Sequence, residues 1–231
     1  MTATFSSVTA RTRIDIDGKT TFEILKRAVE VRPSEFAALH AINDGPYALL
    51  VAIILSQNSN DKNTIAAYED LKRATGLRPE AVLALGERLA QVIRKAGMVR
   101  QKSSAILELS RLVIEKGVKY LEEAPPEELR TALLSIRGVG SKTVDVFLSL
   151  YRRVPVFAVD THARRIAARW GLVKPGAGYE EVSRALLEYF GPERADEAHR
   201  LVIAFGRAYC RARNPRCGEC PLRAHCPSAV A

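Results

Sequence analysis

The sequence predicts an all-α protein. Apolar residues recur at helical spacing along most of the chain, as in residues 21–31. No stretch of convincing length alternates apolar and polar residues as a half-exposed strand does. Prolines and glycines stand where the periodic stretches begin and end, which is typical of helix boundaries. These three features together indicate helices throughout.

Composition narrows the functional classes. The chain has 231 residues, enough for one good core or two small ones, and a net charge of +9 that favours a polyanionic partner, nucleic acid first. A hydrophobic content of 47% indicates a folded globule, and no apolar run is long enough to span a membrane. The N-terminus lacks the apolar segment of a secretory signal, so we expect a cytoplasmic protein whose four cysteines are free thiols or metal ligands.

The first helices follow from apolar patterning. We expect residues 1–18 to be loosely packed and a helix to begin at Thr20 or Thr21 and run to residue 31. After a linker with prolines, residues 47–56 are apolar on every side. Ten residues are too few to cross a bilayer, so this stretch predicts the buried central helix of a helical domain.

Polar junctions separate the next helices. Residues 57–61 are polar, and Asn60 or Asp61 can cap a helix over residues 62–75. A helix over residues 79–95 follows, and residues 97–102 form a loop before a helix over 103–116. Met98 lies in that loop, where a methionine most often packs on a neighbour.

A glycine-containing turn interrupts the helices near residue 138. A helix begun by the prolines at 125–126 ends at Ile136, and the chain passes through Gly138-Val139-Gly140 before another helix starts at Ser141. Such a turn can present free backbone N–H groups to an anion such as phosphate, although glycines also serve turns for steric reasons alone. Further helices are expected over residues 161–170, 179–190 and 192–209.

Two charged residues flank this region. Lys142 lies in the first turn of a helix, where the dipole disfavours a cation and where the placement costs stability unless the amine has a function. Asp160 follows the largely apolar residues 154–159 and can act as the N-cap of the next helix. An amine and a carboxylate near a phosphate-binding turn can also form an activated-nucleophile pair.

All four cysteines lie within the last part of the chain, in the pattern C-x6-C-x2-C-x5-C. They are Cys210, Cys217, Cys220 and Cys226. Four thiolates hold either a tetrahedral Zn²⁺ or a [4Fe–4S] cluster, and spacing alone does not separate the two. The interval between the first two cysteines carries Arg211, Arg213 and Arg216. A charge run is usually a solvated face, but arginines on a rigidly held loop suit phosphate contacts.

The motifs G-V-G-S-K-T and V-D-T-H, with this cysteine spacing, resemble those of endonuclease III-type DNA glycosylases, and the resemblance covers nearly the whole chain. It implies a two-lobed helix-hairpin-helix glycosylase fold with a six-helix barrel over residues 39–154. The second lobe would combine residues 1–38 and 155–231 and hold a [4Fe–4S] cluster, rather than zinc, in the loop 210–226.

The resemblance also implies an activity. The chain is expected to be a bifunctional DNA N-glycosylase and abasic-site lyase of base-excision repair, a monomer acting on double-stranded DNA in the cytoplasm at the nucleoid. Lys142 would be the nucleophile that forms a Schiff base, and Asp160 its carboxylate partner. The hairpin Gly138-Val139-Gly140 would contact DNA phosphates.

Further DNA contacts follow by position. The segment L-S-Q-N-S-N-D resembles the family segment whose amide fills the gap left by a flipped base. That position is Asn58, where the family more often has glutamine, and Gln57 is displaced by one, so both are candidates. Met98 matches the apolar residue that enters the duplex, and Lys102 is a candidate phosphate contact. Arg137 stands where the family commonly has proline.

The expected substrates are oxidised or ring-saturated pyrimidines. Lys142 indicates a lyase-coupled enzyme, and Ala52 stands where adenine-specific relatives carry a glutamate. The given sequence ends five residues after Cys226, so we expect no further domain of the kind that adenine-specific relatives carry. The alternatives are an adenine- or mismatch-specific (thymine or uracil) DNA glycosylase and a non-catalytic DNA-binding module.

Overall fold

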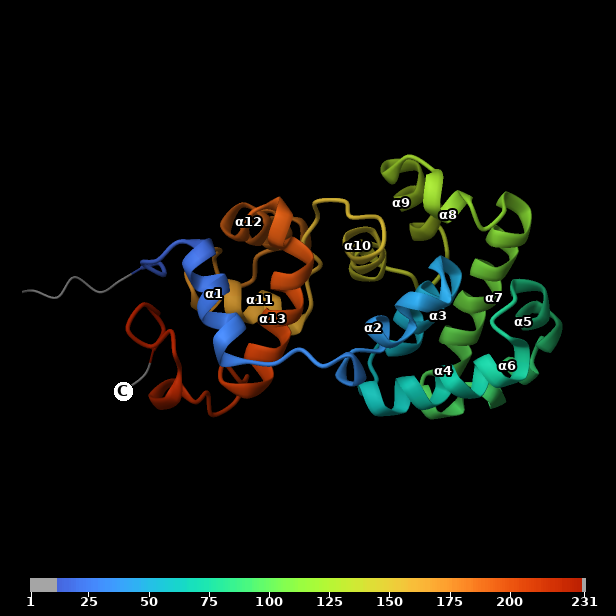
Figure 1. The fold of residues 1–231 in the computed structure, drawn as a ribbon, viewed down its shortest axis with the longest axis horizontal. Coiled ribbons are helices and arrows are strands. Elements are labelled where there is room, and N and C mark those ends of the chain that lie inside the picture. The colour runs from blue at the N-terminus through green and yellow to red at the C-terminus, as the bar shows by residue number, and fades with distance from the viewer. Residues whose placement is uncertain (1–11, 230–231) are drawn as a thin grey trace, which may run out of the picture. The chain divides into compact units, whose positions relative to one another are not determined.

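A computed structural model describes residues 12–229, and within them every regular element is a helix. The chain forms two compact units (Figure 1). The terminal unit comprises the described residues up to Glu30 and those from Val159 onward, and the central unit comprises Val31–Ala158. The sequence-based boundaries at 39 and 154 lie inside the central unit. The first eleven residues of the segment expected to be loosely packed lie outside the described part of the chain.

Each unit has its own set of helices. The central unit contains α2 (Ala37–Ala41), α3 (Pro46–Ser56), α4 (Asp61–Thr75), α5 (Pro79–Leu85), α6 (Arg88–Val92), α7 (Val99–Lys116), α8 (Tyr120–Glu123), α9 (Pro126–Leu134) and α10 (Ser141–Leu150). The terminal unit contains α1 (Gly18–Ala28), α11 (Thr161–Arg169), α12 (Tyr179–Phe190) and α13 (Ala195–Ala208).

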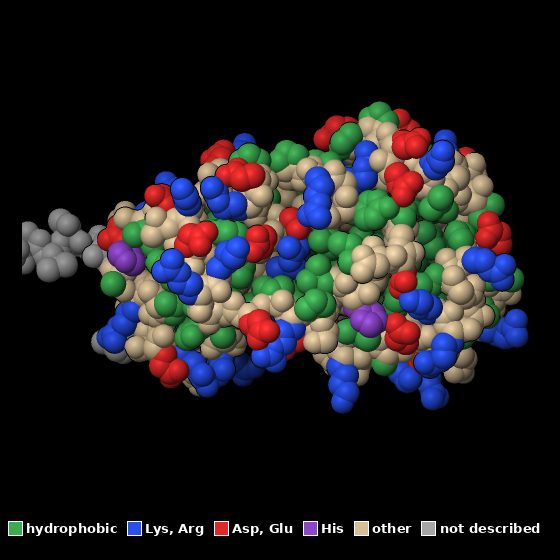
Figure 2. All heavy atoms as spheres, in the orientation of Figure 1, with side chains coloured by type: hydrophobic (Ala, Val, Ile, Leu, Met, Phe, Trp, Pro, Cys, Tyr) green, Lys and Arg blue, Asp and Glu red, His purple; other side chains and the backbone are tan. Residues whose placement is uncertain are grey.

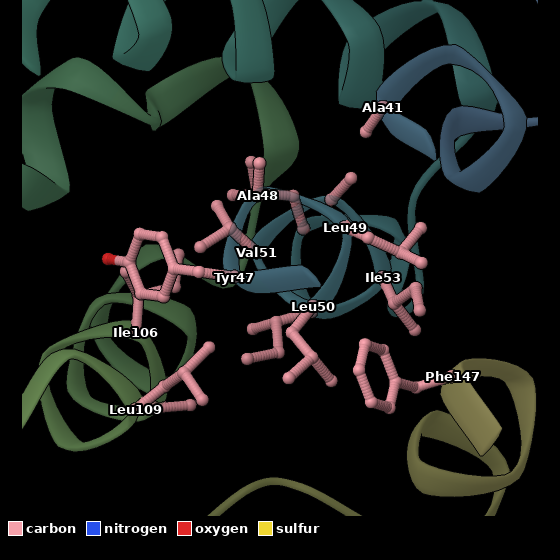
Figure 3. Close-up of a cluster of buried hydrophobic side chains, with 14 of the residues drawn as sticks. Ala41, Tyr47, Ala48, Leu49, Leu50, Val51, Ile53, Ile106, Leu109 and Phe147 are labelled. Carbon is pink, nitrogen blue, oxygen red and sulfur yellow. The ribbon is translucent and has the colours of Figure 1, made fainter. Parts of the chain in front are cut away.

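Helix α3 is the centre of the central unit, as its all-round apolarity predicts. Every residue from Pro46 to Leu55 is buried. Figure 3 shows its side chains pointing in all directions, with Ile106 and Leu109 of α7 and Phe147 of α10 around them. Full burial of one such aliphatic side chain contributes about 1.5–3 kcal/mol before entropy is counted, so the packing around α3 dominates this core.

Several helix limits differ from those predicted. Helix α1 begins at Gly18, before Thr20, because the Asp17 carboxylate caps it by accepting from the Thr20 N–H at 2.6 Å. The helix predicted over residues 79–95 is broken into α5 and α6 at Gly86, whose φ is 52°. A residue with a Cβ rarely adopts that backbone conformation. Helix α7 begins at Val99, so the loop before it is shorter than predicted.

Other limits agree with the sequence. Asn60 caps α4, with its side-chain oxygen accepting from the Asn63 N–H at 2.8 Å. Helix α12 spans Tyr179–Phe190 as predicted. The first of these agreements follows from a local side-chain-to-backbone bond and the second from amphipathic periodicity, and neither needs distant contacts.

The terminal unit packs around Trp170, which is 1% exposed. The rings of Tyr189, Phe190 and Phe205 lie 6.1–6.2 Å from its ring between centroids. The N–H of Ile14 donates to the Trp170 carbonyl at 2.8 Å, and the Ile14 side chain is buried. The expectation that this part of the N-terminal segment is loosely packed is therefore wrong, because Ile14 is buried and the Ile16 carbonyl also accepts from the Tyr189 hydroxyl at 2.9 Å.

A buried ion pair joins α9 and α10, the two helices of the hairpin. Arg130 of α9 donates from Nη1 to the carboxylate of Asp145 in α10. The Asp145 side chain is 0% exposed and the Arg130 side chain 19% exposed. A buried carboxylate is tolerated only when it is paired, so this contact fixes the two helices that carry the glycine turn.

Arg130→Met is expected to destabilise the protein by about 3–5 kcal/mol, because it removes the arginine from a carboxylate that is fully buried. Thermal unfolding measures this loss, which corresponds to a fall in Tm of roughly 6–20 °C for a chain of this size. The double variant Arg130→Met/Asp145→Leu is the control and should recover most of the loss, because both charged groups are gone. An unchanged Tm in the single variant would mean that the pair does not hold the hairpin helices.

Charge is distributed over the visible surface. Lys and Arg side chains lie among Asp and Glu side chains on the visible face of both units (Figure 2). The net charge of +9 is therefore not gathered into one patch on that face. Among residues 12–229, no helix has the length and apolarity needed to cross a bilayer.

Candidate active site and cysteine loop

The turn between α9 and α10 is built around one glycine with a left-handed backbone. Gly138 has a φ of 91°, and a Cβ there would lie 3.2 Å from Cγ of Gln101. Gly140 has an extended φ of −109°, and a Cβ there would meet no atom within 4 Å. The backbone therefore requires glycine at 138 but not at 140, where the missing side chain leaves room for another molecule to approach.

The backbone after this turn offers hydrogen-bond donors. In the described part of the central unit the N–H groups of Gly140, Ser141 and Lys142 have no acceptor, as expected for the first turn of α10. Val139 differs from the expectation that the whole turn contacts DNA. Its side chain is 7% exposed in the core, and its N–H donates to the Ile136 carbonyl at 3.0 Å. The side chain and the N–H of Val139 are thus both engaged within the central unit, so these two groups shape the turn.

Two hydrogen-bonded contacts hold the turn, one from the side chain of Gln57 and one from the backbone N–H of Arg137. Gln57, just after α3, donates from Nε2 to the Gly138 carbonyl and to Oγ1 of Thr143, each at 3.0 Å. The N–H of Arg137 donates to Glu108 of α7 at 3.0 Å. The family commonly has proline at position 137, and proline has no N–H to donate to Glu108. The arginine of this chain therefore adds a hydrogen bond that proline could not make.

Lys142 is the second residue of α10 and is exposed. Its ammonium makes no hydrogen bond or ion pair with the described part of the central unit. Lys142 lies in the first turn of α10, next to Gly140 and Ser141, whose N–H groups are free in the described part of the central unit. The location therefore suits an amine that acts as a nucleophile.

Asn58 and Met98 lie side by side. Both have left-handed backbones, with φ of 48° and 47°, and the amide Nδ2 of Asn58 lies 3.4 Å from the Met98 sulfur. Asn58 is exposed and Met98 is 46% exposed, unusual for a methionine. Of the two candidate amides, only that of Asn58 is turned to the surface beside the exposed Met98.

Lys102 does not lie where a phosphate contact would need it. Its side chain is 1% exposed, and Nζ donates to the carbonyls of Leu55 at 2.8 Å and Ala96 at 2.7 Å. Burial lowers the pKa of its ammonium to about 8. The prediction that Lys102 contacts DNA phosphate is therefore wrong, because its side chain turns inward to two helix-end carbonyls instead of outward.

Asp160 caps α11 in the terminal unit. Its Oδ1 accepts from the Ala163 N–H at 2.7 Å, so the cap reading is correct. Its Oδ2 lies 3.0 Å from Nδ1 of His162. The His162 ring in turn packs closely against α13, since a Cβ at Gly206 would lie 2.6 Å from its Cδ2. Both oxygens of the carboxylate are thus held by a partner, and the Asp160 side chain is still 12% exposed.

The surroundings of Asp160 keep it ionised. Burial raises the pKa of this carboxyl, but the hydrogen bond from His162, the charge of His199 and the N–H of Ala163 outweigh burial and hold the pKa well below its ordinary value. Asp160 therefore carries its negative charge at any pH near neutrality. Such a group can stabilise positive charge or accept a proton, but it does not act as an acid.

Helix α11 also holds the cysteine loop. Arg169 donates from Nη1 to the Cys210 sulfur at 3.3 Å and from both terminal nitrogens to loop carbonyls at 2.7 and 3.1 Å. Arg165 donates to the Cys210 carbonyl at 3.0 Å. The loop contains little regular structure, with one short 3-10 turn at Cys217–Glu219, so these arginines supply much of its support.

All four cysteines are free thiols and line one pocket, together with Trp170, Phe205 and Tyr209. Burial raises the pKa of the Cys220 thiol to about 11 and also raises the pKa of Cys226, and the charges of the other cysteines act in the same direction. Four thiolates are unstable together unless cations neutralise them. The donor set therefore fits an iron–sulfur cluster held by Cys210, Cys217, Cys220 and Cys226, whose iron–thiolate bonds would fold the loop.

The three arginines of the loop are exposed, as a phosphate contact requires. Arg211 donates from Nε to the Arg207 carbonyl at 3.2 Å, and Arg216 lies 3.8 Å from the Glu219 carboxylate. An exposed ion pair of this length contributes little, so Arg216 remains available to an anion.

Sequence reasoning assigned no role to two residues that shape these sites. His162 orients the Asp160 carboxylate, and Arg169 binds the cysteine loop. The V-D-T-H motif contained a signal for the first, because a histidine two residues after the helix cap can reach the cap's carboxylate. Arg169 had no local signal, since its partners lie more than forty residues further along the chain.

The comparisons agree with this geometry. Residues 51–192 match the HhH-GPD superfamily of base excision DNA repair proteins, and residues 210–226 match the iron-sulfur binding domain of endonuclease III. Endonuclease III of Thermotoga maritima is 35% identical over 78% of this chain and 82% of its own length. Endonuclease III of Escherichia coli is 33% identical over 88% and 93%.

Solved structures give the same result. A trapped endonuclease III–DNA covalent intermediate aligns with a TM-score of 0.71 and 33% identity, over 80% of this chain and 84% of that one. A thermostable thymine-DNA glycosylase aligns with a TM-score of 0.73 at 20% identity, which supports the fold alone. The predicted all-α glycosylase fold is confirmed.

A helix-hairpin-helix turn followed by a helix-starting lysine, in a chain with an iron–sulfur loop, defines a base-excision DNA repair protein. The chain belongs to the endonuclease III family, whose members are DNA glycosylases and abasic-site lyases. The predictions of family, enzyme class and iron–sulfur cofactor are therefore confirmed.

The purified protein is expected to be yellow-brown and to contain about four irons per chain, the stoichiometry of a cluster with four thiolate ligands. Metal analysis and the visible absorption spectrum measure this directly. Cys220→Ser is the matched variant, because it removes one ligand and should lower iron content and Tm together. Colourless wild-type protein with one zinc per chain would contradict the assignment.

Proposed function

We propose that this chain excises oxidised or ring-saturated pyrimidines from double-stranded DNA and then cleaves the strand through a Schiff base on Lys142. The observation that carries the proposal is the exposed Lys142 amine at the start of α10, beside free N–H groups that suit a phosphate. The existence of a trapped covalent DNA intermediate in a protein 33% identical to this one supports it. We further propose that the protein works as a monomer, in the cytoplasm at the nucleoid.

The chemistry balances with Lys142 as the only covalent participant. Its neutral amine attacks C1′ of the sugar, the bond from C1′ to the base breaks, and the base leaves with the bonding electron pair. The sugar ring opens as the amine becomes an iminium. Water takes a proton from C2′, and the electron pair of that C–H bond expels the 3′ phosphate, which cuts the strand on that side. Water then hydrolyses the imine and frees the Lys142 amine.

Asp160 would act through its charge. Positive charge develops on the sugar as the base departs, and a fixed carboxylate that stays ionised stabilises it. The lowered pKa of Asp160 and the bond from His162 suit this role better than proton donation.

Asn58 and Met98 would fill the space left by the extruded nucleotide. Rotating a base out of the stack costs a few kcal/mol, and side chains that occupy the gap hold the duplex in that state. Asn58 is favoured over Gln57 because the Gln57 amide already binds the Gly138 carbonyl and Thr143. Exposure and the contact between Asn58 and the Met98 sulfur support a joint role.

The substrate class follows from extrusion cost and from one core residue. Ring-saturated pyrimidines are non-planar and stack poorly, so they are extruded more easily than intact bases. Ala52 is fully buried inside α3, and its methyl group cannot protonate a departing purine. These two features favour damaged pyrimidines over mispaired adenine.

Single-turnover excision on matched duplexes that differ in one base tests the proposal. We expect thymine glycol and dihydrouracil to be removed much faster than adenine opposite 8-oxoguanine, thymine opposite guanine or an undamaged pair. A duplex with a preformed abasic site controls for the lyase step. Faster removal of a mispaired normal base would assign the chain to the mismatch-specific enzymes, and binding without any cleavage would make it a DNA-binding module.

A further inference from the structure

The most unusual side chain in the central unit is Lys102, in the first turn of α7. Lysine is almost never fully buried unless it is paired, yet this one is 1% exposed. Its partners are the carbonyls of Leu55 and Ala96, at 2.8 and 2.7 Å. Both lie at the ends of helical segments, where carbonyl groups have no partner inside the helix and attract a cation.

These two carbonyls lie shortly before the exposed residues Asn58 and Met98 in the chain. Asn58 lies three residues after Leu55, and Met98 lies two residues after Ala96. Left-handed backbone is strained in any residue with a Cβ and persists only where its surroundings hold it. Asn58 and Met98 both have this backbone, and the Lys102 ammonium bonds one carbonyl in each of the two chain segments that carry them.

We propose that Lys102 is a positioning residue that holds Asn58 and Met98 together as one wedge, so that they enter the duplex as a preformed unit. This inference rests on the proposed insertion of these two residues. Lys102 itself touches no DNA. It joins the end of α3 to the start of α7, and the contact between the Asn58 amide and the Met98 sulfur depends on that junction.

A core lysine with a purely structural role would affect stability but not insertion into the duplex. Three variants separate this structural role from the proposed positioning role. Lys102→Met keeps an unbranched chain of similar length and removes the donor. Met98→Ala removes the wedge and leaves the junction intact. Ser110→Ala is the matched control, because Ser110 is also fully buried in α7 and bonds the Tyr47 hydroxyl at 2.7 Å, away from both loops.

The probe is a duplex with 2-aminopurine opposite a tetrahydrofuran abasic analogue, which cannot react with an amine. Insertion into the gap unstacks the 2-aminopurine and raises its fluorescence. Each protein is added to saturation, well below its own Tm. We expect Met98→Ala and Lys102→Met each to reduce the fluorescence rise, and to weaken binding roughly tenfold, as residues that act through one contact do.

The double variant decides between the roles. If Lys102 acts through Met98, the double variant Lys102→Met/Met98→Ala is no weaker than either single variant, whereas independent effects would multiply. Multiplying effects, or a fluorescence rise in Lys102→Met equal to that of Ser110→Ala, would overturn the positioning role. An undiminished rise in Met98→Ala would instead overturn the proposed insertion itself.

If Lys102→Met does not fold, Lys102→Gln replaces it in the same comparison. Glutamine keeps two N–H donors on one nitrogen, although its chain is shorter. Its fluorescence rise should then lie between those of the wild type and Met98→Ala. A full wild-type rise, or an effect that multiplies with that of Met98→Ala, would overturn the positioning role.

Discussion

Lys142→Ala is expected to abolish borohydride trapping on abasic-site DNA and to lower the single-turnover rate of strand cleavage by roughly 10⁴-fold or more, as is found when a covalent nucleophile is removed. The fold should not change, because the Lys142 side chain is exposed and its ammonium has no partner in the described part of the central unit. DNA binding should remain measurable, since the N–H groups of the turn are backbone groups and are retained.

Lys62→Ala is the matched control for this prediction. Lys62 is the second residue of α4, as Lys142 is of α10, and it is likewise exposed. Its replacement should leave trapping and cleavage at saturating enzyme unchanged. Undiminished trapping by Lys142→Ala would transfer the nucleophilic role to another amine.

Asp160→Asn is expected to slow base excision by about 10²–10³-fold, the loss typical of removing one group that stabilises developing charge. Asparagine caps helices about as well as aspartate, so α11 should persist and the affinity for DNA should change little. Single-turnover excision and thermal unfolding of the same preparation separate the two roles. Near-normal excision with a lowered Tm would leave Asp160 as a helix cap only.

The pH dependence of stability gives an independent check on Asp160. Its pKa in the folded protein lies below the ordinary value of 3.8, so the unfolded chain binds the proton more tightly. The carboxylate therefore stabilises the fold above about pH 4, near that unfolded value, and this contribution is lost as the pH falls below it. Asp160→Asn lacks the contribution, so its Tm difference from the wild type should shrink on acidification.

Local signals in the sequence predicted much of the fold. The all-apolar stretch of α3, the Asn60 cap and the periodic α12 depend on residues close together in the chain, and all three agree with the structure. The break at Gly86 was missed because an isolated glycine is tolerated inside a helical pattern, and only the packing of α5 and α6 decides it.

Side-chain direction at the candidate site could not be predicted from the sequence. The sequence predicted that Lys102 lies at the surface, because a buried lysine needs partners. Those partners are the carbonyls of Leu55, 47 positions earlier in the chain, and of Ala96, 6 positions earlier. Gln57 and Asn58 are adjacent and chemically alike, yet one binds the glycine turn and the other faces outward. Tertiary contacts decide between them, and no local pattern records those contacts.

The central claim is that Lys142 forms the covalent bond to DNA. The most direct measurement is to reduce wild-type protein with borohydride on an abasic-site duplex, digest the adduct and locate the modified residue by mass spectrometry. We expect a single sugar-derived adduct on the peptide that contains Lys142. An adduct on any other lysine, or on the N-terminal amine, would contradict it.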